Sequence, residues 1–379
     1  MGRRADVAVV GLGAMGSAAA AHLARRGRRV VGFEQFEAVH DRGSSHGGSR
    51  IIRQAYFEDP AYVPLVLRAY ELWRDVARAA GRDTMVETTG ALMIGPPAGE
   101  LVAGSLRSAR QWGLDHELLD AGELRRRFPA FAPTPETVAV HEPRAGVLNP
   151  EAAVAALLGM ASDAGAELHF SAPVLGWEAD PAGRGVTVTS TAGAVRADQL
   201  VVCPGAWAPQ LLGDVGVPFA VERRVQFWFR PGGARPERFG PGHLPVWIWD
   251  DGGDLPYGLP AVGRPEVKIA WHHRGGRGTA DDLDRTVSPA EVDEIAAAVR
   301  RLVPDMPGSF VAASACLYTL TPDQHFVIGR HPRHPAVVVV SACSGHGFKF
   351  APVIGEIVAD LVTAGATAHP IGLFEPGRF

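Results

Sequence analysis

The amino-terminal pattern starts with an apolar run at residues 6–10, continues through glycines, and then enters an alanine-rich stretch that ends near Arg26. A short continuous apolar run is typical of a buried strand, and the alanine-rich stretch predicts a helix that Gly27 terminates. Residues 30–33 form a second apolar run. The order of strand, helix and strand predicts a βαβ unit.

Helical spacing recurs further along the chain. In residues 61–80 apolar side chains return every three or four positions, which predicts a helix with one packed face. Asn149 followed by proline is a typical helix start. The segment from Ser288 to Glu291 has the pattern of a capping box with proline at the first helical position.

Strand patterns occupy much of the remaining chain, at residues 221–229, 246–249 and 337–342. The last of these runs into a glycine-rich corner and a helix ending at Ala364, so it can return to the sheet that begins at the amino terminus. We therefore predict an α/β fold of two domains, a Rossmann-type nucleotide-binding domain interleaved with a domain built on a mainly antiparallel sheet. The predicted nucleotide-binding domain comprises residues 1–80, 146–218 and 325–379, and the second domain comprises residues 81–145 and 219–324.

The first glycine motif lies between the two strands of the predicted βαβ unit. Gly11, Gly13 and Gly16 form G-x-G-x-x-G, and Glu34 ends the second strand 18 residues after the last glycine. The glycines allow backbone N–H groups to approach a pyrophosphate at the helix start, and the acid can accept ribose hydroxyls. In this context the motif is a strong indication of a dinucleotide site; the alternative is a tight turn that binds nothing.

Charge and cysteine content exclude several classes of function. The net charge of −4 argues against a nucleic-acid-binding surface, and no stretch is apolar for long enough to span a bilayer. Three cysteines without a C-x-x-C pair are too few for a disulfide framework or a zinc site, so we expect a cytoplasmic protein. Histidines 325, 331 and 334 show no recognisable metal spacing. We expect them at the surface or in turns, and we expect no metal.

Residues 44–53 follow the second strand and contain small residues and two arginines. The small residues permit close approach of a ligand to the backbone. If this segment turns helical, Arg50 and Arg53 share a face. One could contact a cofactor while the other grips a substrate carboxylate with two hydrogen bonds. The alternative is a solvated loop with two surface arginines.

A lysine interrupts the apolar pattern at residues 267–272. Lys268 alternates with Val267 and Ile269 across the predicted strand. Edge strands often carry lysine, because its charge prevents pairing with other chains. Lys268 is therefore either an edge-strand charge or a site residue.

The carboxyl-terminal third contains a cysteine strand and a second glycine-rich corner. Cys316 and Tyr318 share a strand face by the two-residue period, although a free cysteine most often behaves as a small buried hydrophobe. The corner at residues 344–350 offers backbone N–H groups at a helix start, which suit an anionic ring edge or a carbonyl. Lys349 adds a cation there.

Together these segments resemble a known family. HGGSRIIR, VKIAWHH, ACLYTLTPDQHFVIG and SGHGFKF, in this order after GLGAMG, are similar to the monomeric sarcosine oxidase family. That family includes N-methyltryptophan and pipecolate oxidases, within the wider group that resembles D-amino-acid oxidase. The resemblance covers essentially the whole chain, and it implies that the bound nucleotide is FAD.

The resemblance also implies residue roles. Cys316 is the thiol bonded to the flavin 8-methyl carbon, and Lys268 is the cation that assists dioxygen reduction. Arg53 and Lys349 hold the substrate carboxylate, with Tyr318 beside them. The implied catalytic residues are Lys268, Arg50, His46, Tyr257 and His272. The implied cofactor contacts are Gly11, Gly13, Gly16, Glu34, Ser44, Ser49, Cys316, Gly345, His346, Gly347 and Lys349.

The resemblance implies an FAD-dependent oxidase of a secondary amine in an N-methyl or cyclic amino acid. The product is an imine that water hydrolyses, and dioxygen becomes hydrogen peroxide. A fixed cation stabilises the negative charge that develops on dioxygen. Two cations on one carboxylate orient the amine, and a pocket rich in cations disfavours its ammonium form. We expect a monomer whose partners are this small substrate and dioxygen.

Two alternatives remain open at this point. One is a specialised imino-acid oxidase or dehydrogenase of a biosynthetic pathway, which peroxide formation would separate from the oxidase. The other is a catalytically inactive flavin-binding partner protein, which the presence of Lys268, Arg53, Lys349 and Cys316 disfavours. The aromatic runs at residues 227–229 and 247–249 match no segment of the family. They are either core or part of the substrate pocket, so the substrate stays open.

Overall fold

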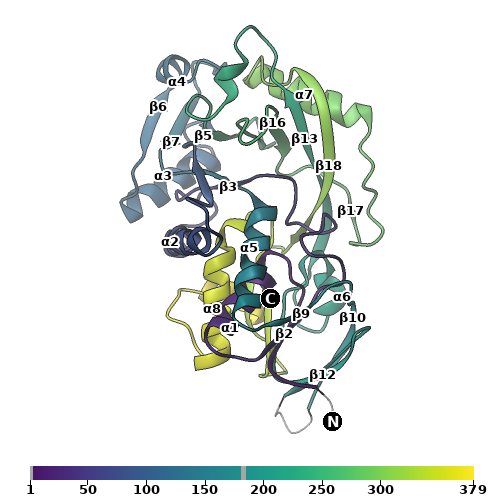
Figure 1. Ribbon diagram of the computed structural model, residues 1–379. Helices are drawn as coiled ribbons and strands as arrows, with labels where there is room; N and C mark the ends of the chain where they lie inside the picture. Colours follow the sequence, from purple (N-terminus) through teal and green to yellow (C-terminus); the bar gives the residue numbers. More distant parts are fainter. Residues whose placement is uncertain (1–2, 181–184) are drawn as a thin grey trace.

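The computed structural model describes residues 3–180 and 185–379. Two large sheets organise the chain, with an eight-stranded sheet in the lower half of Figure 1 and a nine-stranded sheet in the upper half. A small third sheet pairs β3 (Arg50–Ile52) and β4 (Val86–Thr88) with β8 (Gly146–Leu148). The predicted α/β class is confirmed.

The eight-stranded sheet is centred on β1 (Arg3–Val10), which runs parallel to β2 (Val30–Phe33) and to β12 (Gly193–Val202). β20 (Val337–Ser341) pairs in parallel with β12, so the carboxyl-terminal strand does return to this sheet, as predicted. The remaining strands are β9 (Glu167–His169), β10 (Val174–Ala179), β11 (Val186–Ser190) and β19 (Val327–Arg330).

Helices pack on this sheet through small residues. α1 (Ala14–Arg25) contacts both α5 (Pro150–Asp163) and α8 (Ala351–Ala364). A side chain at Gly355 would overlap the backbone of Ala18, so this glycine permits the close approach of α8 to α1. α2 (Val63–Ala79) packs against α8 and α5, and these helices share one core with β1 and β20.

The nine-stranded sheet is antiparallel except where β14 meets β5, which confirms its predicted character. Its two longest strands, β13 and β18, pair along most of their length. In chain order the strands are β5 (Ala91–Gly95), β6 (Glu117–Asp120), β7 (Val138–Glu142), β13 (Ala220–Arg230), β14 (Val246–Trp249), β15 (Pro256–Leu259), β16 (Val267–Trp271), β17 (Arg277–Gly278) and β18 (Ser309–Leu320).

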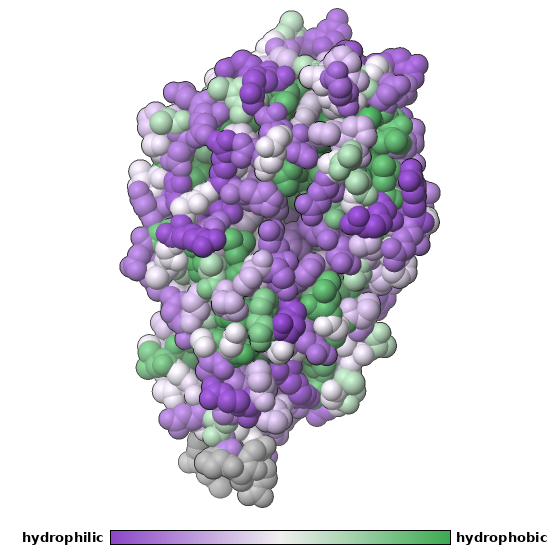
Figure 2. Space-filling model, turned by 180° about the vertical axis from the view of Figure 1, so that it is seen from behind, coloured by the Kyte–Doolittle hydropathy of each residue, from purple (hydrophilic) through white to green (hydrophobic). Residues whose placement is uncertain are grey.

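The other helices are short or lie at the periphery. They are α3 (Glu100–Trp112), α4 (Ala121–Arg127), α6 (Ala208–Leu211) and α7 (Pro289–Leu302). The 3-10 turns are η1 (Pro60–Tyr62), η2 (Gly205–Trp207), η3 (Pro236–Phe239), η4 (Phe348–Phe350), η5 (Gly372–Phe374) and η6 (Pro376–Arg378). Within the described ranges, every helix falls short of the length and apolarity that crossing a bilayer requires. Figure 2 shows a largely hydrophilic rear face with scattered hydrophobic patches.

Both predicted helix caps are confirmed. Asn149 accepts a hydrogen bond from the Ala152 N–H at 2.9 Å and so satisfies an otherwise unpaired donor of α5. Ser288 and Glu291 form the reciprocal capping box of α7. The predicted helix at residues 61–80 begins later, at Val63, because a 3-10 turn precedes it.

Two local interpretations require correction. The segment from Arg50 to Ile52 is a strand, so Arg50 and Arg53 share no helical face. Lys268 is not on an edge strand, because β16 lies between β13 and β15. His331 follows β19 in a turn, as expected, and its side chain is buried there.

Candidate active site

A cavity of about 450 Å³ is lined by residues of both large sheets. Val10 and Ser341 come from the eight-stranded sheet, whereas Lys268 and Cys316 come from the nine-stranded sheet. The predicted residues that line it are Gly11, Gly13, Glu34, Ser44, Ser49, Arg50, Arg53, Tyr257, Lys268, His272, Cys316, Tyr318, Gly345, His346, Gly347 and Lys349. The cavity therefore gathers most of the predicted site.

One end of the cavity is the glycine turn between β1 and α1. Gly11 has φ +82°, and a side chain there would overlap the carbonyl oxygen of Cys203. A side chain at Gly16 would overlap the carbonyl oxygen of Gly11, so Gly16 shapes the turn from behind and does not line the cavity. Gly13 caps α1, whose amino terminus favours an anion. This turn fits a dinucleotide pyrophosphate.

Glu34 braces the glycine turn at the end of β2. Its Oε2 accepts the Leu12 N–H at 2.8 Å, and its Oε1 accepts the Phe36 N–H at 3.2 Å. A carboxylate offers about four lone-pair sites on its two oxygens. Oε1 also lies 3.3 Å from His40 Nε2, so it is Oε2 that keeps acceptor capacity for a ribose hydroxyl.

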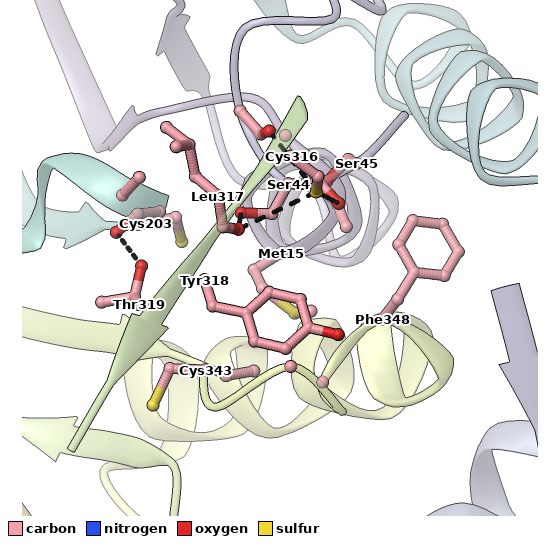
Figure 3. A pocket seen from close by; sticks show the side chains of 18 of the residues that line it. Met15, Ser44, Ser45, Cys203, Cys316, Leu317, Tyr318, Thr319, Cys343 and Phe348 are labelled. Atoms are coloured by element: carbon pink, nitrogen blue, oxygen red, sulfur yellow. Dashed lines mark hydrogen bonds between the residues drawn. The ribbon is translucent and has the colours of Figure 1, made fainter. Parts of the chain in front are cut away.

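The segment at residues 44–53 bridges the two sheets. Ser45 Oγ accepts the Ala14 N–H of α1 at 3.3 Å, whereas Ser44 Oγ donates to the Leu317 carbonyl of β18 at 2.5 Å. Figure 3 shows both serines beside Cys316 at one side of the pocket, with the ring of Tyr318 extending into it. The segment thus brings the glycine turn and the cysteine strand to one wall.

Cys316 is unusually acidic for a buried thiol. Arg50 Nη2 lies 3.8 Å from its Sγ. Burial raises the pKa of Cys316. A hydrogen bond from His46 and the charge of Arg50 act in the opposite direction, and the pKa falls below its ordinary value, to about 7. A pKa near neutrality provides the nucleophilic thiolate. His46 lies outside the cavity wall, and it acts on the site through this thiol.

The other two cysteines have no such partners. Burial alone raises the pKa of Cys203, and burial also dominates at Cys343, whose pKa is raised despite hydroxyl partners. Their thiols stay protonated at neutral pH. Cys316 is therefore distinguished by its neighbouring His46 and Arg50.

Lys268 lies on the cavity floor formed by the nine-stranded sheet. Its ammonium donates to the carbonyl oxygens of Gly47 and Ser49 and to Oε1 of Gln226. Burial, and next the charge of Arg50, hold its pKa well below the usual lysine value. The side chain is thus a buried amine whose hydrogen-bond partners are uncharged oxygens, with no carboxylate in hydrogen-bonding contact among the described residues.

Arg53 and Lys349 form a second cationic region. Arg53 is paired with both oxygens of Glu58 at 2.6 and 2.7 Å, and its guanidinium lies 4.2 Å from the ring centre of Tyr56. Lys349 donates to the His346 carbonyl at 2.7 Å and to Tyr56 Oη at 3.3 Å. Burial, and next the charge of Arg53, lower the pKa of Lys349 to about 7.

Glu58 is a site residue that the sequence analysis missed. Burial raises its pKa, but the charge and hydrogen bond of Arg53, together with the charges of His346 and Lys349, outweigh this effect and the pKa falls to about 2. Glu58 is therefore a carboxylate at neutral pH, and it occupies the guanidinium expected to bind a substrate carboxylate. The sequence did contain a signal for this pairing, namely an acidic residue five positions after Arg53.

The aromatic side of the cavity contains Tyr257, Tyr318 and His272. Burial raises the pKa of Tyr257, an effect that Tyr318 opposes, and the rings of Tyr318 and His272 meet edge to face at 5.9 Å. Arg224 lies 4.9 Å from the ring centre of Tyr318 and donates to the His272 carbonyl at 3.0 Å. Arg224 was also missed, although the period of the strand at residues 221–229 places it beside Gln226 on one face.

The second glycine-rich corner, at residues 344–350, packs directly on the aromatic wall of the cavity, which consists of Tyr257, Tyr318 and His272. A side chain at Gly345 would overlap the ring of Tyr318, and one at Gly347 would overlap the carbonyl oxygen of Ala342. Both ring nitrogens of His346 have partners, Tyr56 Oη at 2.7 Å and the Gln324 carbonyl at 3.1 Å. His346 therefore has no ring nitrogen left for a hydrogen bond to a ligand.

The unmatched aromatic runs are mostly core. Phe227, Phe229, Trp247 and Trp249 belong to the core of the nine-stranded sheet. Ile248, between the two tryptophans, lines the cavity instead. The aromatic side chains of these runs therefore pack in the core behind the pocket, and Ile248 alone among the residues just named lines it.

A histidine cluster lies away from this cavity. Ligand atoms of Asp214, His331 and His334 fall within 4.8 Å of one another. The Arg333 N–H donates to His331 Nδ1 at 3.1 Å, so the proton of the neutral ring sits on Nε2, 3.2 Å from Asp214. Arg333 also pairs with Asp214 at 2.6 Å. The carboxylate of Asp214 is thus in ionic contact with both His331 and Arg333.

Known proteins resemble the chain along nearly its full length. It is 54% identical to monomeric sarcosine oxidase of Streptomyces avermitilis over 378 residues, covering 98% of this chain and 97% of that protein. It is 33% identical to N-methyl-L-tryptophan oxidase of Salmonella heidelberg over 377 residues, covering 99% of each.

Solved structures agree with the fold. NikD, an amino acid oxidase essential for nikkomycin biosynthesis, superposes with a TM-score of 0.85 at 25% identity, covering 99% of this chain and 98% of NikD. Glycine oxidase from Geobacillus kaustophilus gives 0.83 at 25% identity, covering 100% of this chain and 99% of that chain. The model of the FAD dependent oxidoreductase family (DAO) matches residues 6–361. The chain therefore belongs to the FAD dependent oxidoreductase family.

Proposed function

We propose that the protein oxidises the secondary amine of an N-methyl or cyclic amino acid, using FAD bonded to Cys316 and dioxygen as the electron acceptor. The observation that carries the proposal is the cavity itself. It combines the glycine turn, the acidified Cys316 thiol and the three buried cations Lys268, Arg53 and Lys349. The sarcosine and N-methyltryptophan oxidases among the relatives support the same substrate class.

Arg53 and Lys349 would hold the substrate carboxylate. Both are at least nine-tenths buried, so their hydrogen bonds to an anion are strengthened by exclusion of water. Because Glu58 already pairs with Arg53, an incoming carboxylate shares or displaces it. The carboxylate would fix the amine in position for reaction.

The aromatic wall would contact the remainder of the substrate. Tyr257, Tyr318, His272 and Ile248 all line the cavity. The pKa of His272 is held well below its usual value, chiefly by burial, so its ring is neutral at neutral pH. The nearby cations disfavour a protonated amine, which leaves its lone pair available for oxidation.

When bound, FAD supplies the two-electron redox chemistry, in which the amine becomes an imine and dioxygen becomes hydrogen peroxide. Lys268 would place a fixed positive charge where negative charge develops on dioxygen. Arg50 and His46 would favour the thiolate of Cys316 for attachment of the cofactor. Ser44, Ser49, Gly345, Gly347 and the glycine turn would line its binding surface.

We also propose the domain division given by the sequence, with residues 1–80, 146–218 and 325–379 forming the FAD-binding domain and residues 81–145 and 219–324 forming the substrate domain. Sheet membership supports it, because the strands of the eight-stranded sheet fall in the first set and those of the nine-stranded sheet fall in the second. A cytoplasmic monomer is part of the same proposal, and the three unpaired cysteines support a reducing setting.

A peroxide assay over sarcosine, N-methyltryptophan, proline and pipecolate tests this function. We expect peroxide in proportion to imine formed for at least one N-methyl or cyclic substrate. Turnover that requires an artificial electron acceptor would instead indicate a dehydrogenase. Full flavin loading with no turnover of any of these amines would indicate a flavin-binding partner protein.

A further inference from the structure

Gln226 occupies the cavity floor beside Lys268. It lies in β13, between β18 and β16, and only 3% of it is exposed. Its Oε1 accepts hydrogen bonds from Lys268 Nζ at 3.0 Å and from Arg50 Nη1 at 3.3 Å. Lysine and arginine are donors only, so the carboxamide oxygen must face them. The orientation of Gln226 is therefore fixed by its two neighbours.

The carboxamide completes the coordination of the Lys268 ammonium. An ammonium has three N–H donors. The structure provides three acceptors, namely the carbonyl oxygens of Gly47 and Ser49 and Oε1 of Gln226. Gln226 is the one side chain among these acceptors.

The surrounding charges do not by themselves keep Lys268 charged. Arg50 from β3 and Arg264 from the turn before β16 disfavour its proton, and burial disfavours it most. Cys316 from β18 and Glu151 from α5 favour it, but Glu151 is engaged by the backbone N–H groups of the neighbouring glycines. Uncharged acceptors in direct contact must therefore compensate for burial.

The loop opposite Gln226 is shaped to fit it. Gly47 has φ +100°, and a side chain at this position would overlap the Gln226 carboxamide. The Nε2 group of Gln226 is buried without a hydrogen-bond partner in the described part of the chain. A buried donor without a hydrogen bond destabilises the fold. The favourable contribution of Gln226 therefore comes from the two hydrogen bonds that its Oε1 accepts.

We infer that Gln226 is a positioning residue, which fixes the Lys268 ammonium in place and keeps it charged during dioxygen reduction. The inference rests on the proposed role of Lys268. Because all three Lys268 donors are occupied, Lys268 acts on dioxygen through its field, and the proton that peroxide requires comes from another donor.

The test compares Gln226→Leu with Gln226→Glu in the flavin-loaded enzyme. Two quantities are measured across pH: the midpoint potential of the bound flavin, and the rate constant for dioxygen reaction by stopped flow. Loss of the Lys268 proton lowers both. A hydrogen bond to a charged group corresponds to about a tenfold change in acid strength, which is about one pH unit. We expect this transition at lower pH in Gln226→Leu and at higher pH in Gln226→Glu.

Gly47→Ala provides a second route that leaves residue 226 unchanged, because its methyl group would overlap the carboxamide. Backbone strain at φ +100° also disturbs the Gly47 carbonyl that Lys268 bonds, and this change acts in the same direction. We expect it to shift the transition in the direction of Gln226→Leu. Flavin content and thermal unfolding are recorded for each variant, so that a misfolded variant can be excluded. The role of Gln226 is then judged from the variants that fold and bind flavin.

Lys268→Met separates this inference from the proposed function. If Lys268→Met reacts with dioxygen as fast as the parent, the proposed role of Lys268 fails. If Lys268→Met is slow and lacks the transition, but the Gln226 and Gly47 variants keep it at the parent pH, the inference about Gln226 is overturned. Opposite shifts in the leucine and glutamate variants support it.

Discussion

At the residue scale, identical side chains acquire different chemistry from their neighbours. The sequence nominated Cys316 through a family resemblance. It could not predict the acidity of the thiol, because His46 and Arg50 lie more than 250 positions away in the chain. Glu58 was missed for a different reason: it is only five residues from Arg53, but their pairing depends on how the loop after β3 folds back.

Arg53→Ala should weaken the binding of carboxylate inhibitors by about tenfold or more, because charge-assisted hydrogen bonds contribute about 1.5–3 kcal/mol each. The readout is the inhibitor dissociation constant from flavin difference spectra. The single variant also leaves Glu58 unpaired in a largely buried position. The double variant Arg53→Met with Glu58→Gln removes both charges and controls for that effect. Unchanged affinity in both variants would remove Arg53 from the substrate site.

Carboxylate affinity should also depend on pH through Lys349. Its pKa in the free enzyme is lowered to about 7, so the ammonium is present below this pH and is lost as pH rises through it. Inhibitor binding should therefore be constant at low pH and weaken above about 7. Lys349→Met should bind more weakly and abolish this dependence. A parent enzyme whose affinity is flat across this range would contradict the assignment.

At the element scale, local signals were predicted well, whereas most strand pairings, apart from the return of β20 to the first sheet, were not. The βαβ unit, both caps and the run at residues 246–249 follow from periodicity and capping residues. The strand at residues 50–52 was missed because it is three residues long and is held by pairing with a distant segment, β8. The burial of Lys268 likewise depends on β13 and β15, which flank its strand.

Ser288→Ala should destabilise the protein by about 1 kcal/mol, because it removes the hydroxyl that accepts the Glu291 N–H, which is one half of the capping box. Chemical denaturation measures this change. Ser288→Thr retains a capping hydroxyl and should recover most of the loss. Flavin content should be unchanged in both variants, since α7 lies outside the cavity wall.

At the scale of the whole molecule, one cavity depends on both sheets. The interleaved arrangement could be predicted because the two ends of the chain carry the glycine turn and the returning strand. The position of the cavity could not, because it follows from how residues 44–53 bridge α1 and β18. A cofactor bound there would contact both sheets and link them.

FAD should therefore stabilise the whole protein. In the Cys316→Ala variant the cofactor is reversibly bound, so the flavin-free protein can be prepared. Its thermal midpoint should rise with FAD concentration, by the equivalent of about 2.7 kcal/mol at one hundred times the dissociation constant. Differential scanning calorimetry measures the rise, and riboflavin, which lacks the pyrophosphate, serves as the control. A midpoint independent of FAD would contradict a site that spans both sheets.

The measurement that tests the central claim most directly is acid precipitation of the purified protein and of its Cys316→Ala variant. The account predicts that the yellow colour of the parent stays in the pellet and that digestion yields one flavin-bearing peptide containing Cys316. The variant should release its flavin into the supernatant. Release of flavin from the parent, or retention by the variant, would contradict the tether at Cys316.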